Sequence, residues 1–150
     1  MKTSDLLDER LAWPDEQRER GGPWRLGHGL ASVGPGWWPL VRAAFAAAAE
    51  TPGAEVRDVR QKFGALELWL HHEDAARRDA LRAAAAACTE ASRSRCEGCG
   101  AAVERLAPGR MTWRLHCVEC AAFVAAAGDR AERKLWEWRA GLPWPPFDGW

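Results

Sequence analysis

Apolar residues recur at helical spacing along much of this chain, and helices are predicted in four stretches. The first stretch follows a capping residue, Thr3 or Ser4, and stops at Pro14, because proline breaks a helix interior. In the third stretch, which is rich in alanine and arginine, Leu81 and Cys88 share one face. The four helices are predicted within residues 3–20, 37–50, 73–91 and 121–139, the last with a break at Gly128-Asp129.

Between residues 54 and 71 the apolar positions switch toward a period of two, which predicts β-strands. Phe63-Gly64 stands between two such runs, and a central glycine predicts a tight turn. The apolar residues are Val56 and Val59 before the turn and Leu66, Leu68 and Leu70 after it. Together with the helices, this pattern predicts the α+β class, with helices around a small β-hairpin sheet.

Length and charge narrow the possible functions. The chain has 150 residues, enough for about one domain with a core of its own. Its 21 basic and 21 acidic residues give zero formal net charge, which excludes a globally basic nucleic-acid binder but not a local basic patch. Apolar runs fall short of the roughly 20 residues of a membrane span, and the N-terminus lacks a secretion signal. We therefore expect a cytoplasmic protein without membrane contact, in a reducing compartment.

Three regions of the chain differ in composition. Residues 1–36 combine the predicted N-terminal helix with a loop rich in glycine and proline. Residues 37–140 are expected to form the α+β body, with a cysteine-rich segment at 93–122, and residues 141–150 form an aromatic and proline-rich tail. The aromatic residues near this end either cover the core or bind a partner or a base: Trp136, Trp138, Trp144, Phe147 and Trp150.

Four of the five cysteines form two Cys-x-x-Cys pairs, with 17 residues between Cys99 and Cys117. This spacing is typical of a zinc site, because two thiolates on a tight turn can face one ion and two such turns complete a tetrahedron. Gly98 and Gly100 allow the first turn. Four thiolates leave no open position for a catalytic water, so zinc catalysis is not expected. We therefore predict a structural Zn²⁺ in a zinc ribbon, with the ligands Cys96, Cys99, Cys117 and Cys120.

Other interpretations of the cysteines are open. Reduced structural cysteines, a thioredoxin-type dithiol or an iron site would use the same residue types. His116 precedes Cys117 and could replace one thiolate, although a histidine at a strand end near the metal, where it could hydrogen-bond to a sulfur, is the simpler interpretation. The fifth cysteine, Cys88, lies on an alanine-rich helix face, which indicates a small buried apolar side chain.

Two further groups of polar residues are candidates for chemistry. His71-His72-Glu73-Asp74 contains general-base and metal-ligand types, yet a strand end followed by a helix N-terminus also explains it. Residues 90–120 contain five arginines against four glutamates, among them Glu97, which leaves +1, a thin charge for phosphate binding. A solvated surface of mixed charge is the simpler interpretation of these residues. The arginines are Arg93, Arg95, Arg105, Arg110 and Arg114.

Short motifs add a resemblance to a known family. The motifs are Gly36-Trp37-Trp38-Pro39-Leu40, then Arg60-Gln61-Lys62-Phe63-Gly64-Ala65-Leu66, then the two cysteine pairs. This order resembles a family of small proteins of bacteria and their phages with GW-x-x-L, K-E-K-F-G-x-L-R and a four-cysteine zinc ribbon. The resemblance covers about residues 27–122, implies a compact α+β body with a zinc site, and implies no activity. Arg60, Gln61 and Glu67 depart from that pattern, and Glu67 weakens any anion-binding role for the hairpin.

These observations predict a zinc-stabilised, non-enzymatic protein whose surface binds another protein, as an interaction or regulatory module. A nucleic-acid-binding zinc-ribbon protein is the alternative, and salt-dependent DNA binding would distinguish it. A hydrolase that uses His71 and His72 is the third interpretation.

Overall fold

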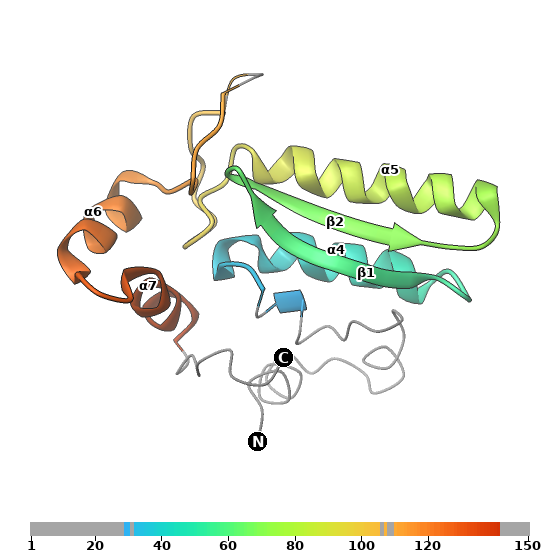
Figure 1. Ribbon diagram of the computed structural model, residues 1–150, viewed down its shortest axis with the longest axis horizontal. Coiled ribbons are helices and arrows are strands. Elements are labelled where there is room, and N and C mark those ends of the chain that lie inside the picture. The colour runs from blue at the N-terminus through green and yellow to red at the C-terminus, as the bar shows by residue number, and fades with distance from the viewer. Residues whose placement is uncertain (1–28, 31, 106, 108–109, 142–150) are drawn as a thin grey trace.

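The computed structural model describes residues 29–30, 32–105, 107 and 110–141 of the chain (Figure 1). These residues form helices around a two-stranded antiparallel sheet, which confirms the predicted α+β class. The predicted N-terminal helix, most of the glycine-rich loop and the aromatic tail after residue 141 lie outside the described residues. The described elements are η1 (Pro35–Trp37), α4 (Trp38–Ala49), β1 (Glu55–Lys62), β2 (Ala65–His71), α5 (Ala75–Ser92), α6 (Val118–Ala127) and α7 (Ala131–Ala140).

The predicted hairpin is confirmed, and its turn has two residues. Lys62 pairs with Ala65, so Phe63 and Gly64 alone connect β1 to β2. The φ angles of Phe63 and Gly64 are both positive, 51° and 82°, and this combination matches the twist of a hairpin. Glycine adopts such an angle without strain. The sheet buries Val56, Val59, Leu66 and Leu70.

One face of α4 and one face of α5 pack against each other and against the hairpin (Figure 1). The α4 residues that the helical spacing places on one face are buried, namely Leu40, Val41, Ala44, Phe45 and Ala48. On α5, Leu81 and Cys88 are both buried, as their shared face predicts. The Cys88 thiol lies 3.5 Å from the Leu40 carbonyl oxygen, so this cysteine is a small buried group between the two helices.

The C-terminal helices α6 and α7 pack against each other at one end of the molecule (Figure 1). The predicted break between them is confirmed, because Gly128 ends α6 with a φ of 65° and α7 starts at Ala131. α6 begins at Val118, earlier than predicted, because the Cys117 sulfur caps its first turn. None of the helices in the described part of the chain has both the length and the apolarity to span a bilayer.

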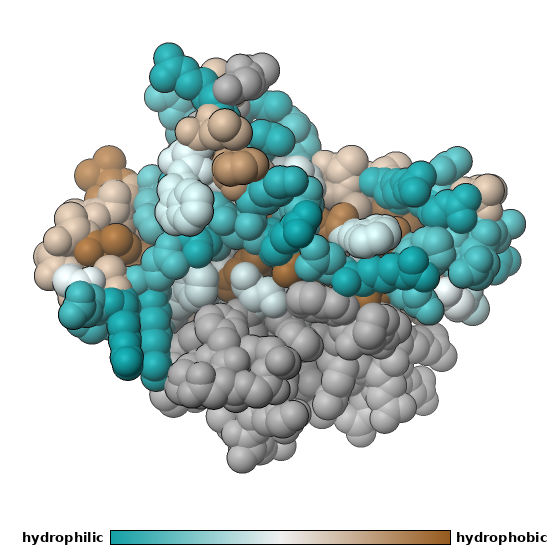
Figure 2. All heavy atoms as spheres, viewed as in Figure 1, coloured by the Kyte–Doolittle hydropathy of each residue, from teal (hydrophilic) through white to brown (hydrophobic). Residues whose placement is uncertain are grey.

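α6 is an apolar helix of which little is covered. Of its ten residues, Cys120 alone is buried and Glu119 alone is charged. Val118 is 89% exposed. Figure 2 shows apolar residues gathered at the end of the molecule where α6 lies. The other exposed apolar residues of the helix are Ala121, Ala122, Ala125 and Ala126.

Candidate metal centre

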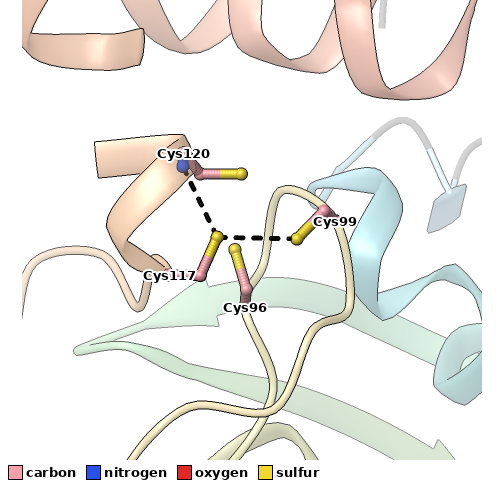
Figure 3. Close-up of side chains that lie close together, drawn as sticks. All are labelled: Cys96, Cys99, Cys117 and Cys120. Carbon is pink, nitrogen blue, oxygen red and sulfur yellow. Dashed lines mark hydrogen bonds between the residues drawn. The ribbon is translucent and has the colours of Figure 1, made fainter. Parts of the chain in front are cut away.

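The four predicted cysteines converge where residues 96–100 meet the start of α6 (Figure 3). Their sulfur atoms all lie within 4.8 Å of one another, and none of the four takes part in a disulfide. The sulfurs of Cys99 and Cys117 are 3.7 Å apart. A tetrahedron with metal–sulfur bonds of about 2.3 Å has edges of about 3.8 Å. The donor set and its spacing therefore fit a tetrahedral, thiolate-bound metal ion.

The first cysteine pair lies on a turn, as predicted. The Gly100 N–H donates to the Cys96 carbonyl at 2.8 Å, which closes the turn. Gly100 has a φ of 79°, in the left-handed region that favours glycine. Gly98 lies against the second pair, since a Cβ there would be 3.0 Å from the Cys120 sulfur. Gly100 is thus favoured by its backbone conformation, and Gly98 by the close approach of the turn to Cys120.

The second cysteine pair lies at a helix start, and the prediction of a second tight turn is wrong. Cys117 is the N-cap of α6 and Cys120 lies in its first turn. The Cys120 N–H donates to the Cys117 sulfur at 3.4 Å. A helix N-terminus carries partial positive charge, so it stabilises a thiolate without help from a turn. Among the described residues of 93–122, β-pairing is limited to one isolated bridge, Arg95 with Ala102.

Burial and hydrogen bonding act differently on the four thiols. Cys96 and Cys120 are fully buried, whereas Cys99 and Cys117 are half-buried. Burial raises the pKa of the Cys99 and Cys120 thiols. Burial acts on Cys117 in the same direction, but hydrogen bonds from the Cys120 backbone and from neighbouring thiols outweigh it and lower the Cys117 pKa to about 7. Cys117 is therefore substantially ionised near neutral pH, which favours metal binding.

Arg139, in the last turn of α7, reaches the sulfur cluster from the side. Its Nε donates to the Cys120 sulfur at 3.4 Å, and its Nη2 lies 3.3 Å from the Glu119 carboxylate. Its guanidinium carbon lies 3.8 Å from the centre of the Trp138 ring. Trp138 in turn stacks on Phe123 of α6, with ring centres 4.7 Å apart. α7 thus brings a positive charge to the cysteines that α6 carries.

A buried ion pair holds the first cysteine turn in place. Glu97 follows the first cysteine and is 0% exposed. Arg114 Nη1 donates to its two carboxylate oxygens at 2.9 and 3.1 Å, and the Gly34 N–H donates to Oε1 at 3.2 Å. Arg114 also pairs with Glu132 of α7. Burial raises the pKa of Glu97, and the Arg114 charge and the Gly34 hydrogen bond oppose that rise.

The glycine-tryptophan motif before α4 packs directly on the same turn. The Gly36 N–H donates to the Glu97 carbonyl at 2.7 Å, and the Trp37 indole donates to the Arg95 carbonyl at 3.0 Å. A Cβ on Gly36 would lie 2.1 Å from the Cys96 carbonyl oxygen, so the approach requires glycine. The sequence interpretation placed this glycine in a loop and missed the contact. The adjacent Trp-Trp-Pro run was the signal, because a loop that faces water rarely carries it.

His116 does not join the cluster, although it adjoins a ligand. It lies outside the four-sulfur group, and its Nε2 is buried without a hydrogen-bond partner among the described residues. The hydrogen bond from this histidine to a sulfur is therefore not formed. Burial lowers the pKa of His116, and the nearby Arg114 charge adds to this effect.

The two histidines at the end of β2 occupy a structural position. His72 is buried, its Nε2 lies 2.8 Å from the Pro52 carbonyl oxygen, and its Nδ1 accepts the Asp74 N–H at 2.9 Å. Asp74 caps α5 by accepting the Arg77 N–H. His71 lies 3.3 Å from Glu73. These contacts match a strand end followed by a helix N-terminus.

Of the aromatic residues near the C-terminus, two lie in the described part of the chain. Trp136 is buried, under the Arg114 guanidinium, and so covers the core. Trp138 is 45% exposed. The remaining three lie outside the described residues: Trp144, Phe147 and Trp150.

Comparisons with known proteins give no evidence on function, so the proposal below depends on the geometry of the site. No family model matches the chain, and no match was found among the curated proteins or the solved structures. The resemblance to the bacterial and phage family therefore stays a prediction.

Proposed function

We propose that this chain is a structural, non-enzymatic zinc protein, in which the metal fixes α6 to the body as a binding surface for another protein. The convergence of four sulfurs within 4.8 Å carries this proposal. Thiolates in a tetrahedron suit Zn²⁺, and four protein ligands leave no position for a reacting water. When bound, the ion would cross-link the turn at 96–100 to the start of α6. The ligands would be Cys96, Cys99, Cys117 and Cys120.

The exposed surface of α6 supports a protein as the partner. This helix carries no cation, and its exposed residues are Val118, four alanines and, in the first turn, Glu119. Small side chains allow the backbone of a second helix to approach closely, and an apolar patch outside the core is typical of a protein interface. The half-exposed Trp138, stacked on Phe123, extends the same apolar surface. We therefore expect the partner to contribute an apolar helix face.

The charge pattern favours a protein over a nucleic acid. Arg60 lies 3.3 Å from Asp58, and Arg93 lies 3.8 Å from Glu90. Arg114 is held by two carboxylates. Phosphate binding depends on cations that neutralise several phosphates, and a neighbouring carboxylate works against that.

Metal analysis of the full-length chain, purified without a metal-binding tag, tests the zinc site. We expect one zinc per chain, loss of zinc in Cys99→Ser, and a lower melting temperature in that variant because zinc binding contributes to folding. Cys88→Ala is the matched control, since Cys88 is buried outside the cluster and its loss should leave the zinc content unchanged. Wild-type protein that is fully folded without any metal would contradict the proposal.

A charge on α6 tests the binding surface. Ala122→Glu places a carboxylate on the exposed side of the helix, and Ala83→Glu makes the same change on the exposed side of α5. We expect both variants to keep wild-type zinc content and melting temperature. Wild type and Ala83→Glu should retain the same bound proteins from an extract of the host, and Ala122→Glu should lose them. Equal retention by both variants, or retention of nucleic acid that salt removes, would refute the α6 surface.

A further inference from the structure

The negative charge of the four thiolates can be compensated by hydrogen-bond donors, so it matters which sulfur each donor contacts. A divalent ion with four thiolates keeps two negative charges, and two of the sulfurs, those of Cys96 and Cys120, belong to fully buried residues. A buried charge is costly unless a donor or an opposite charge compensates it. The first turn of α6 directs the Cys120 N–H to Cys117, not to the Cys120 sulfur. Compensation at Cys120 must therefore come from another element.

Arg139 is placed to provide that compensation. Its Nε donates to the Cys120 sulfur at 3.4 Å, and its side chain is 19% exposed, so water screens the contact only weakly. The Trp138 ring on one side and the Glu119 carboxylate on another orient the guanidinium. Because Trp138 stacks on Phe123, this orientation is coupled to the packing of α7 on α6. Glu119 is 70% exposed, so it competes little for the charge.

We propose that Arg139 is a positioning residue of the metal centre, which keeps the Cys120 thiolate in the ligand set by donating to its sulfur. This inference rests on the proposed zinc site. Groups that hydrogen-bond to metal ligands commonly change metal affinity by about 10–100-fold when they are removed. Arg139 thereby makes α7 part of the metal centre, although it supplies no ligand.

Zinc competition with the chelating dye 4-(2-pyridylazo)resorcinol tests the role of Arg139 in the full-length protein. We expect Arg139→Gln to bind zinc about 10–100-fold more weakly than wild type. Arg139→Lys keeps the positive charge but not the planar donor, so its zinc affinity should lie between those of wild type and Arg139→Gln. Arg133→Gln is the matched control on α7, because Arg133 pairs with Glu137 at 3.2 Å, away from the sulfurs, and its zinc affinity should match wild type.

Cobalt substitution separates a direct role from a merely structural one. A hydrogen bond lowers the energy of the sulfur electrons, so its loss should move the sulfur-to-cobalt charge-transfer band of Arg139→Gln to longer wavelength. Zinc affinity within about two-fold of wild type, or an unmoved band, would overturn the inference while the zinc site itself stands. A wild-type chain that binds neither metal would instead refute the proposed function.

Discussion

The buried pair of Glu97 and Arg114 leads to a stability prediction that the structure quantifies. Arg114→Met removes the guanidinium, which lies over the Trp136 ring, and leaves an unbranched apolar side chain in its place. The fully buried carboxylate of Glu97 then keeps the Gly34 N–H as its one hydrogen-bond donor among the described residues. Removing one partner of a buried ion pair costs about 3–5 kcal/mol. The Arg114 side chain is 21% exposed, so we expect the lower end of this range.

Protonation of the stranded carboxyl sets an upper limit on the loss. Glu97 can escape its unpaired charge by binding a proton, and for an ordinary glutamate pKa of about 4.3 this costs about 4 kcal/mol at about pH 7.5. We therefore expect Arg114→Met to lower the free energy of unfolding by about 3–4 kcal/mol. In a chain of this length that corresponds to a melting temperature lower by about 10 °C.

Urea unfolding, followed by tryptophan fluorescence at a fixed free zinc concentration, measures this loss. Zinc must be fixed because a ligand that binds the folded state adds to its stability. The double variant Glu97→Gln/Arg114→Met should recover about 1–2 kcal/mol, since no buried charge is left. Arg133→Met, which breaks a partly buried pair one helical turn apart on α7, should stay within about 0.5 kcal/mol of wild type. The reasoning fails if Arg114→Met costs less than about 1 kcal/mol, or if the double variant is the less stable of the two.

Three further predictions concern the metal centre and the hairpin. Gly36→Ala should lower both the melting temperature and the zinc content, because its Cβ would overlap the Cys96 carbonyl oxygen; unchanged values would refute this packing. Ser92→Ala should cost about 1–3 kcal/mol in chemical unfolding, since the buried Ser92 hydroxyl accepts the Leu66 N–H at 2.9 Å; a loss near zero would show that this bond contributes nothing. Zinc occupancy should rise with pH and fall below about pH 6, because protons compete with the metal for the thiolates. Dialysis across that range with metal analysis checks it, and full occupancy at about pH 4 would contradict thiolate ligation.

Local patterns in the sequence predicted the elements well where one signal dominated. The apolar face of α4, the Phe63-Gly64 turn and the break at Gly128 each depend on neighbours within a few residues. The start of α6 was placed too late, because the side chain that caps it is a cysteine. Helix-start rules rest on serine, threonine, aspartate and asparagine, whose oxygens accept the first N–H groups. In α6 the Cys117 sulfur accepts that hydrogen bond instead.

The four-cysteine cluster was predictable, and the groups around it were not. The spacing of the cysteines was enough to predict that the four sulfurs lie together. Glu97 and Arg114 appeared as members of a mixed charged surface, because charged residues are rarely fully buried. Their pairing depends on tertiary contacts, which no local pattern encodes, and so does the approach of Gly36. Arg139 likewise reaches Cys120 across 19 residues of sequence.

The contacts of the glycine-tryptophan motif also bear on the order of folding. The Trp37–Arg95 and Gly34–Glu97 hydrogen bonds join residues 58 and 63 positions apart. During synthesis the Trp37 indole therefore leaves the ribosome long before its carbonyl acceptor exists. Contacts this distant in sequence form late, whereas the hairpin and α5 can fold from adjacent residues. We therefore expect the docking of this motif on residues 95–97 to come late in folding, so that Trp37 stays uncovered in the nascent chain until those residues have been made.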